Sequence, residues 1–405
     1  MFGLARSTLW LKRLIAPLAI LVLVGVILVP SLAILSHTEE VKGNLDDCYV
    51  GVAFCGNTTA EAKLLVDRVK DYTNLLIIQS GPVSVNETSL NEICEYAIAS
   101  NLDIIVFFGD LDPAIIANNT AKAWRSAWVN SAKPRWGDNL IGIYYYDEPG
   151  GMWIDTFSNE TISPRLWKNL SNATYSSIAE KAVRQLRNDY GIAQMKNNSI
   201  PIIVSDYALY WFDYLGGYDT VLTEIAWNHS LAQDIALVRG AATLQNKDWG
   251  AIISWKYDQS PYLDSGEAIY EQMTIAYQTG AKYVAIFNYP QMPDNPYGVM
   301  KDEHFEALEK FWNDAVNQRI IHGSIKAEAA LVLPKDYGWG MRHQNDRIWG
   351  FWGPDEKSPV IWDQKNRLLS QYGYTLDIVY DDPAFPFTGK YNQIYFWNSS
   401  EPITG

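Results

Sequence analysis

The chain contains eight short apolar segments, each followed by a segment with the periodicity of an amphipathic helix. The apolar segments lack polar alternation, so both faces of each strand would be buried, as in a parallel sheet covered by helices. Eight consecutive strand–helix units favour an α/β fold in which the strands close into a (β/α)8 TIM barrel. The expected strands are 49–54, 74–79, 103–108, 140–146, 201–205, 220–226, 250–256 and 282–288. The expected helices include 60–72, 90–100, 174–190, 231–244, 267–279 and 304–317.

The residues after the barrel repeat the pattern on a smaller scale. Strands at 328–333, 375–380 and 393–397 and a helix at 360–372 predict a small α/β C-terminal domain over 325–405, which resembles a flavodoxin-like appendage. An aromatic, Gly-rich loop precedes this helix. We interpret its tryptophans, Trp339, Trp349 and Trp352, as packing residues.

The N-terminal region contains an apolar run of 22 residues without a charge, Leu14–Leu35. A helix of this length can span a bilayer. Arginine and lysine precede the run and Glu39 and Glu40 follow it, so the positive-inside rule leaves the N-terminus in the cytoplasm. A cleaved signal peptide ending near Ser31-Leu32-Ala33 is the alternative, and both interpretations export the remainder of the chain.

This pattern predicts a single-pass protein of the cell membrane with an extracellular C-terminal part. The expected organisation is a cytoplasmic N-terminus (1–13), a transmembrane signal anchor (14–35), a linker (36–47), the TIM-barrel domain (48–320) and the small α/β domain (325–405).

Nine Asn-X-Ser/Thr sequons are spread through the exported part and predict a glycoprotein. They are Asn57, Asn86, Asn118, Asn159, Asn169, Asn172, Asn197, Asn228 and Asn398. An anchor, many sequons and an acidic composition together resemble an archaeal surface protein.

The composition narrows the classes of function. The formal net charge of −14 argues against a nucleic-acid partner. The spacing of Cys48, Cys55 and Cys94 matches no zinc signature, and the thiols are expected to be buried small hydrophobes, although one disulfide is possible on count alone. The five histidines show no metal spacing, and no nucleotide-binding fingerprint is present, so neither a metal nor a cofactor is expected. The 16 Trp and 25 Tyr suit a protein that stacks against sugar rings.

Functional groups of a TIM barrel lie at the C-terminal ends of its strands. The fourth strand ends in Asp147-Glu148-Pro149. This step resembles the Asn-Glu-Pro step of the large clan of TIM-barrel glycoside hydrolases, in which the Glu is the general acid/base. The resemblance implies that Glu148 is the acid/base, and it places the clan's nucleophile, a Glu, at the end of strand seven. This chain departs from the pattern, because it has Asp147 in place of Asn and Asp258 after strand seven.

Glycoside hydrolysis needs one protonated and one ionised carboxyl group, and their separation distinguishes retaining from inverting chemistry. The candidates for the partner of Glu148 are Glu224, on the sixth strand, and Asp258. A structural role is the alternative for each of the three, as a helix cap or as an ion pair with Lys256. Asp147 is interpreted as a supporting residue, and Asp110 and Asp206 are weaker candidates.

Aromatic and polar residues at the strand ends and in the two long loops, 150–172 and 207–219, are expected to bind the sugar. The set is Tyr146, Asp147, Trp153, Tyr207, Trp211, Trp227, Trp255, Lys256, Tyr257, Asn288 and Tyr289.

The sequence therefore predicts a cell-surface glycoside hydrolase with a carbohydrate substrate and a membrane anchor. The alternative is a non-catalytic, glycosylated scaffold or glycan-binding protein on a degenerate barrel, because the strand-seven Glu is missing. A second carboxyl group facing Glu148 would favour the enzyme.

Overall fold

A computed structural model describes residues 45, 48–112, 122–156, 172–227, 229–290, 292 and 294–404. The expected anchor at 14–35 lies outside these residues, as do the N-terminus and most of the linker. Among the helices of the described part, none combines the length and apolar character that a membrane crossing requires. Residues Leu45–Gly405 form one compact unit.

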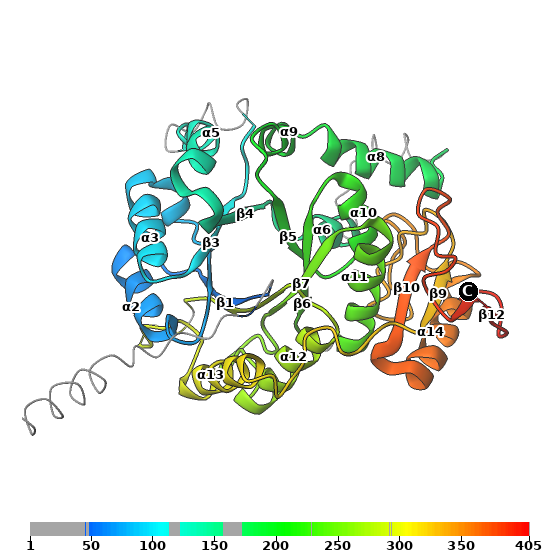
Figure 1. Cartoon of the computed structure of the whole chain (residues 1–405). Coiled ribbons are helices and arrows are strands. Elements are labelled where there is room, and N and C mark those ends of the chain that lie inside the picture. Colours follow the sequence, from blue (N-terminus) through cyan, green and yellow to red (C-terminus); the bar gives the residue numbers. More distant parts are fainter. Residues whose placement is uncertain are drawn as a thin grey trace, which may run out of the picture. The chain divides into compact units, whose positions relative to one another are not determined.

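Eight parallel strands close into a barrel in the order of the sequence (Figure 1). β1 pairs with β8 in register from Tyr49 opposite Tyr283 to Phe54 opposite Asn288, and this pairing closes the sheet. The predicted barrel is thus confirmed. Its strands are β1 Tyr49–Phe54, β2 Leu75–Ile78, β3 Asp103–Phe108, β4 Leu140–Tyr145, β5 Ile202–Asp206, β6 Thr220–Ile225, β7 Asp248–Ile253 and β8 Tyr283–Asn288.

The strands are buried on both faces, which explains their continuous apolar runs. Every residue of β2 and β6 is buried, including Thr223 and Glu224. Close strand packing also explains a glycine, because a Cβ on Gly51 of β1 would lie 1.9 Å from the Leu75 carbonyl oxygen. A charged group within this layer therefore needs hydrogen-bond partners, and Glu224 is such a group.

Helices surround the barrel (Figure 1). Those predicted from periodicity are α2 Thr59–Val69, α3 Glu87–Ala99, α8 Tyr175–Arg187, α11 Leu231–Gln245, α12 Gly266–Gln278 and α13 Asp302–Val316. Further helical elements are η1 Val83–Val85, α5 Arg125–Trp136, η3 Gly137–Asn139, α6 Pro149–Thr156, α9 Tyr190–Asn197 and α10 Tyr210–Gly216. The interpretation of 150–172 and 207–219 as loops is corrected, since α6 and α10 occupy parts of them. Both helices are short and Gly-containing, so their periodicity is weak.

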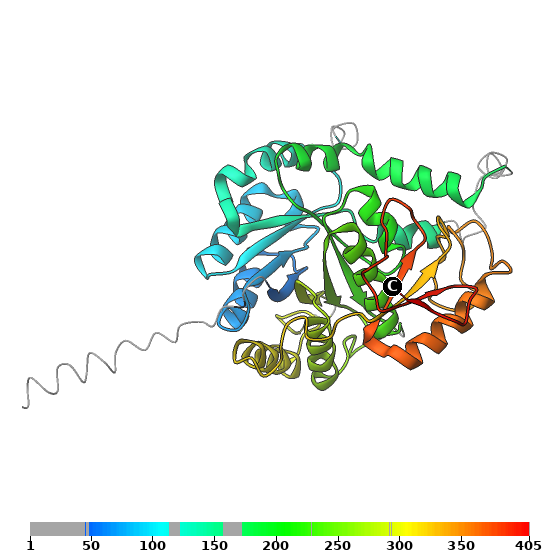
Figure 2. The ribbon, with the colours of Figure 1, turned by 45° about the vertical axis from the view of Figure 1, so that its right-hand side comes forward.

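The C-terminal segment forms a second sheet in the order β10-β9-β11-β12. The elements are β9 Ala329–Leu333, α14 Ser358–Tyr372, η4 Gly373–Thr375, β10 Leu376–Tyr380, β11 Gln393–Phe396 and β12 Ile403–Thr404. Barrel helix α11 packs against β10 on one side, and α14 packs against β9 and β10 on the other (Figure 2). Trp339 and Trp349 are buried in the loop before α14, which confirms their packing role.

Candidate active site

Two residues after β4 adopt left-handed backbone conformations, Tyr146 with φ 62° and Glu148 with φ 47°. Side chains alternate between the faces of a strand, so adjacent Asp147 and Glu148 could not both face the site within β4. The strand ends at Tyr145, and the irregular backbone beyond it releases them from this alternation. The Glu148 amide donates to the Ser205 carbonyl at 3.1 Å, which ties this turn to β5.

Glu224 approaches the same place from β6. Its side chain is buried, and Ser205 Oγ of β5 donates to its Oε1 at 2.6 Å. Ser205 Oγ also lies 2.7 Å from the hydroxyl oxygen of Tyr144 on β4, and Tyr144 donates to Asp147. Three neighbouring strands thus link Asp147 to Glu224 through two hydroxyl groups.

Glu148 and Glu224 lie close enough to shift each other's pKa. Burial first, and the charge of Asp147 second, raise the pKa of Glu148, whereas a side-chain hydrogen bond with Glu224 lowers it. Burial first, and the charge of Glu148 second, raise the pKa of Glu224 well above its usual range, against the opposing hydrogen bond from Ser205. Two carboxyl groups this close to each other disfavour simultaneous ionisation.

Asp147 is solvent-exposed, yet burial is the main cause that raises its pKa, while the hydrogen bond from Tyr144 lowers it. Asp147 thus reaches water even though protein atoms surround its carboxyl group.

Positive charge does not neutralise these carboxyl groups. Within the described ranges, no Lys, Arg or His forms an ion pair with Asp147, Glu148 or Glu224. The alternative in which Lys256 pairs with a site carboxylate is therefore not realised in the structure. Asp258 is exposed and lies beyond the end of β7 at Ile253. Of the two candidate partners, the structure brings Glu224 to Glu148.

Asp206 fixes the helix that follows Glu148. Its buried carboxylate accepts backbone hydrogen bonds from Gly150 at 2.5 Å and Gly151 at 2.8 Å, at the N-terminus of α6. Burial raises the pKa of Asp206 to about 7, and these backbone donors oppose the rise. Burial first, and the charge of Asp206 second, raise the pKa of Asp213 well above its usual range.

In the sequence, the pair of glycines that follows Glu148 and Pro149 is the signal of this contact between α6 and the end of β5. A Cβ on Gly150 would lie 2.4 Å from the Ala208 carbonyl oxygen, and one on Gly151 would lie 2.1 Å from the Tyr207 ring. Only glycine allows α6 to approach the end of β5 this closely, so the Gly-Gly pair after Pro149 marks a close contact rather than a loose loop.

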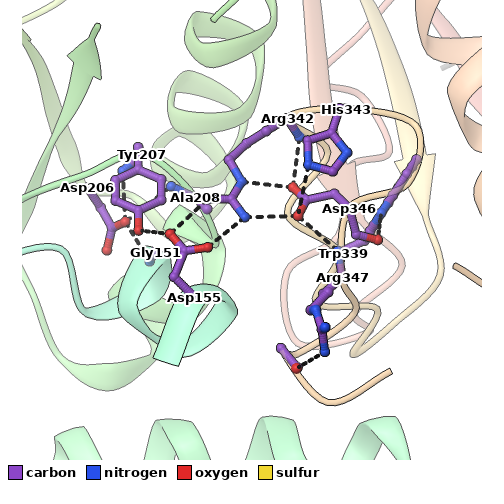
Figure 3. Close-up of polar contacts among 11 residues, drawn as sticks. Gly151, Asp155, Asp206, Tyr207, Ala208, Trp339, Arg342, His343, Asp346 and Arg347 are labelled. Carbon is purple, nitrogen blue, oxygen red and sulfur yellow. Dashed lines mark hydrogen bonds and ion pairs between the residues drawn. The ribbon is translucent and has the colours of Figure 1, made fainter. Parts of the chain in front are cut away.

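The C-terminal segment contributes Arg342 to the rim of the barrel (Figure 3). Arg342 donates to both oxygens of Asp155 on α6 at 2.9 Å, and its Nε and Nη2 donate to Asp346 at 2.9 Å. Tyr207, after β5, donates to the same Asp155 at 2.5 Å, and its ring lies 5.5 Å from the Arg342 guanidinium carbon. The second sheet and the site helix are therefore joined by charge-assisted hydrogen bonds. The sequence analysis did not detect this network.

The Arg342 network predicts an acid-dependent stability. Burial would raise the pKa values of Asp155 and Asp346, but the hydrogen bonds and charge of Arg342 hold both below their usual range. Depressed pKa values contribute stability above the unfolded-state pKa, near 4, and the contribution disappears as the pH falls through the folded-state values. Arg342→Gln should lower the free energy of unfolding at pH 7 by about 2–3 kcal/mol, because it leaves buried Asp346 without its cation.

Urea denaturation of wild type and variant at a series of pH values checks this expectation. The difference in the free energy of unfolding between wild type and variant should shrink as the pH falls from about 5 to about 3, where the two carboxylates become protonated. The control is Arg184→Gln, which breaks an exposed pair with Glu180 and should change stability by about 0.5 kcal/mol or less. A deficit that is the same at every pH would refute the electrostatic explanation.

The expected sugar-binding aromatics divide into two groups. Trp227, Tyr257 and Tyr289 are 40%, 44% and 38% exposed, after β6, β7 and β8. Half-buried Trp255 contacts Tyr289 edge to face, with ring centroids 5.3 Å apart. These four form an aromatic rim.

The remaining members of the set have protein partners. Trp211 is buried against Tyr380 and Phe385, so its ring faces protein rather than a ligand. Half-buried Trp153 lies edge to face with Trp349, and Tyr146 donates to Asp189 at 2.7 Å. The buried Asn288 side chain accepts from the Val299 amide at 3.1 Å, which gives it a structural bond.

Metal and thiol chemistry receive no support from the residues that can be described. Among them, no cluster of three or more His, Cys, Asp or Glu could hold a metal ion. Cys48, Cys55 and Cys94 are free and buried, and burial raises the pKa of each thiol, as expected for small core residues.

The sequence matches no protein-family model and no curated protein. Among solved structures, it is similar to α-L-fucosidase isoenzyme 2 from Paenibacillus thiaminolyticus, with 10% identity, a TM-score of 0.51, and coverage of 86% of this chain and 59% of the fucosidase. It is also similar to a GH5_18 variant from Bifidobacterium longum in complex with Manb1-4GlcNAc, with 11% identity, a TM-score of 0.48, and coverage of 88% and 97%. The pneumococcal virulence factor StrH follows with 12% identity, a TM-score of 0.41, and coverage of 69% and 85%.

This chain thus spans less than two thirds of the fucosidase. At these identities the comparisons establish the fold alone: the chain has the barrel fold that TIM-barrel glycoside hydrolases also use.

Proposed function

We propose that this protein is a glycoside hydrolase in which Glu148 and Glu224 are the two catalytic carboxyl groups. The observation that carries the proposal is that Ser205 bonds to both residues, through its carbonyl to the Glu148 amide at 3.1 Å and through its hydroxyl to Glu224 at 2.6 Å, while no cation of the described residues pairs with either carboxyl group. A structural ion pair would place a Lys or Arg beside them. Two neighbouring carboxyl groups without a cation lower the stability of the fold. Such pairs with raised pKa values are typical of catalytic sites.

The burial of the two groups suggests their roles. Glu148 is half-buried and Glu224 is buried. A general acid/base must reach the leaving oxygen and then the incoming water, so the more exposed Glu148 suits this role. Glu224, held by Ser205, suits the nucleophile. Burial favours the protonated form of Glu224 in the free protein, so this proton must leave before Glu224 can act as the nucleophile.

The proximity of the two groups also favours retention of configuration. An inverting pair needs room for a water molecule and lies about 6.5–9.5 Å apart, whereas a retaining pair lies about 5–5.5 Å apart. In the retaining reaction Glu148 protonates the glycosidic oxygen while Glu224 bonds to the anomeric carbon. Glu148 then takes a proton from water as water displaces Glu224.

The proposed substrate is a glycan outside the cell. An exported position rests on the apolar run at 14–35 and on the sequons. Asn57, Asn86, Asn172, Asn197 and Asn398 are exposed, as a glycosylation site must be. The other sequons, Asn118, Asn159, Asn169 and Asn228, lie outside the described residues.

The test is hydrolysis of aryl and native glycosides by the full chain. The proposal requires activity that depends on both Glu148 and Glu224. Full activity without either carboxyl group would refute it, and failure of every glycoside together with glycan binding would favour the non-catalytic scaffold.

The aromatic rim predicts a loss of substrate affinity on substitution. Trp227 has a left-handed backbone (φ 51°), held by a hydrogen bond from its amide to the Trp255 carbonyl at 2.7 Å. This strained backbone presents an exposed indole three residues after Glu224, where a sugar ring can stack. Trp227→Ala should raise KM for oligosaccharides about tenfold, equivalent to about 1.4 kcal/mol, with kcat nearly unchanged.

Steady-state kinetics on substrates of one, two and three sugars checks this expectation. Tyr96→Ala, on the outer face of α3 beside Asp67, is the control and should leave KM unchanged. An unchanged KM for the longest substrate in Trp227→Ala would show that the rim does not contact the glycan.

A further inference from the structure

The chain of contacts between Asp147 and Glu224 contains fewer hydroxyl hydrogens than it needs. Three oxygen–oxygen contacts follow one another: Asp147 with Tyr144, Tyr144 with Ser205 at 2.7 Å, and Ser205 with Glu224 at 2.6 Å. Each contact needs one hydrogen between its oxygens. Tyr144 and Ser205 supply one hydroxyl hydrogen each. Two hydrogens cannot occupy three contacts, so a carboxyl group supplies the third.

A neighbouring donor does not remove this deficit. Gln79 Nε2 donates to the Tyr144 hydroxyl oxygen at 3.3 Å, but this is an additional, fourth contact and leaves the other three contacts unchanged. Without a third hydrogen, the Tyr144 and Ser205 oxygens would face each other with lone pairs only, 2.7 Å apart in a buried site. Leaving a hydrogen bond unmade between two buried oxygens lowers the stability of the folded state.

We propose that Asp147, Tyr144, Ser205 and Glu224 form a proton relay that carries one proton between exposed Asp147 and buried Glu224. With the proton on Glu224, Glu224 donates to Ser205, Ser205 donates to Tyr144, and Tyr144 donates to ionised Asp147. With the proton on Asp147, the direction of every hydrogen bond in the relay is reversed. Asp147 donates to Tyr144, Tyr144 donates to Ser205, and Ser205 donates to ionised Glu224. Both arrangements use three hydrogens, and all three contacts are made in each.

The relay explains how a buried Glu224 can act as a nucleophile, so this inference rests on the proposed function. Moving the proton to Asp147 leaves Glu224 ionised and hydrogen-bonded by Ser205, the state in which it can attack. The Glu148–Glu224 contact needs a hydrogen of its own, and Glu148 then carries it as the general acid. The three carboxyl groups therefore hold two protons and one negative charge in the reactive state.

The surroundings of the relay favour this protonation. The titratable groups that face it from neighbouring elements are neutral or acidic. They are Cys55, Glu148, Asp206 and Tyr210. Burial raises the pKa of Asp147. Burial, followed by the charges of Glu148, Asp147 and Asp206, raises the pKa of Glu224, and both directions agree with a proton held between the two groups.

The infrared carbonyl stretch of protonated carboxyl groups tests the relay without any substrate. Difference spectra of the full chain at pH 7 compare wild type with Tyr144→Phe, Asp147→Asn and the double variant. Tyr144→Phe breaks the chain of contacts, and Asp147→Asn supplies an amide hydrogen in place of the acidic one. Each should remove one protonated carboxyl group, and the double variant should also remove only one, because both changes act on the same proton.

The control is Tyr214→Phe. Tyr214 is also buried, and its hydroxyl donates to the Asp248 carbonyl at 2.8 Å, at the start of β7 and outside the relay. It should leave the number of protonated carboxyl groups unchanged. A Tyr144→Phe spectrum identical to that of Tyr214→Phe, or a loss of two groups in the double variant, would overturn the relay. Because no substrate is involved, an inactive protein with the expected spectra would refute the hydrolase alone, and an active protein with unchanged spectra would refute the relay alone.

Discussion

Glutamine in place of Glu148 is expected to lower kcat for alkyl glycosides by about 10²–10⁴-fold, the range that a general acid contributes. Glutamine is nearly isosteric but carries no acidic proton. For a dinitrophenyl glycoside, whose leaving group needs no protonation, kcat/KM should change little, whereas kcat should fall because water must attack the covalent intermediate without a general base. Glu224→Gln should abolish turnover of both substrates, because the bond to the anomeric carbon cannot form without a carboxylate. Parallel assays of the two substrates therefore separate the roles of the two residues.

Three observations complete this experiment. Azide should restore turnover of Glu148→Gln on the activated substrate, since a small anion can replace water without a general base. Asp258→Asn is the control, because Asp258 is exposed beyond the end of β7, and its activity should equal that of wild type. The assignment fails if Glu148→Gln loses kcat/KM equally on both substrates, and the roles are exchanged if Glu224→Gln is the variant whose kcat/KM depends on the leaving group.

Loss of Arg239 should have the largest effect on stability, about 3–5 kcal/mol in the free energy of unfolding. Arg239 of α11 and Asp377 of β10 are 6% and 1% exposed and form an ion pair at 2.7 Å. Arg239 Nη2 also donates to the Tyr374 and Leu376 carbonyls, and Tyr391 donates to Asp377. Arg239→Leu would leave Asp377 charged and buried between the barrel and the second sheet.

The pH dependence identifies the cause of this loss. Burial raises the pKa of Asp377, and Arg239 opposes the rise. Without Arg239 only burial and the Tyr391 hydrogen bond remain, so the folded-state pKa rises further above the unfolded value. Stability is then retained below the unfolded pKa, near 4, and lost as the pH rises through the folded pKa. Urea denaturation should therefore show that the stability lost in Arg239→Leu grows as the pH rises above the folded-state pKa that Asp377 has in wild type.

Two further variants test the argument. Lys282→Leu breaks a partly exposed pair with Asp248 and should cost about 1 kcal/mol or less. The double variant Arg239→Leu/Asp377→Leu should recover part of the loss, since two apolar side chains leave no buried charge. A double variant as unstable as Arg239→Leu would assign the loss to packing instead.

The barrel could be predicted because its physical cause is local in the sequence. A parallel strand covered by helices on one face and by the barrel interior on the other is apolar at every position, so β2 and β8 appear as continuous runs. Helices such as α13 appear through their periodicity. The short helices α6 and α10 were missed because one or two turns, with glycines, leave too few positions to show a period.

The Asp147-Glu148 step was also visible, through its place at the end of the fourth strand and its resemblance to the Asn-Glu-Pro step of TIM-barrel glycoside hydrolases. Its geometry was not visible. Alternation along a regular strand allows only one of the two side chains to face the site, and the left-handed backbone at Tyr146 and Glu148 removes that restriction. Backbone conformations of this kind depend on tertiary contacts, here the bond from the Glu148 amide to β5.

The sequence by itself determined the eight-stranded barrel, the small second α/β unit and the position of Glu148 at the barrel mouth. These follow from periodicity and from the rule that strand ends of a barrel meet at one face. Only the tertiary structure decided that Glu224, and not Asp258, lies close to Glu148, that Tyr144 and Ser205 connect Asp147 to Glu224, and that Arg342 reaches Asp155. Tyr144 and Ser205 are 61 positions apart, and Arg342 and Asp155 are 187 apart. Contacts over such separations depend on strand register and on the docking of the second sheet, which no local pattern encodes.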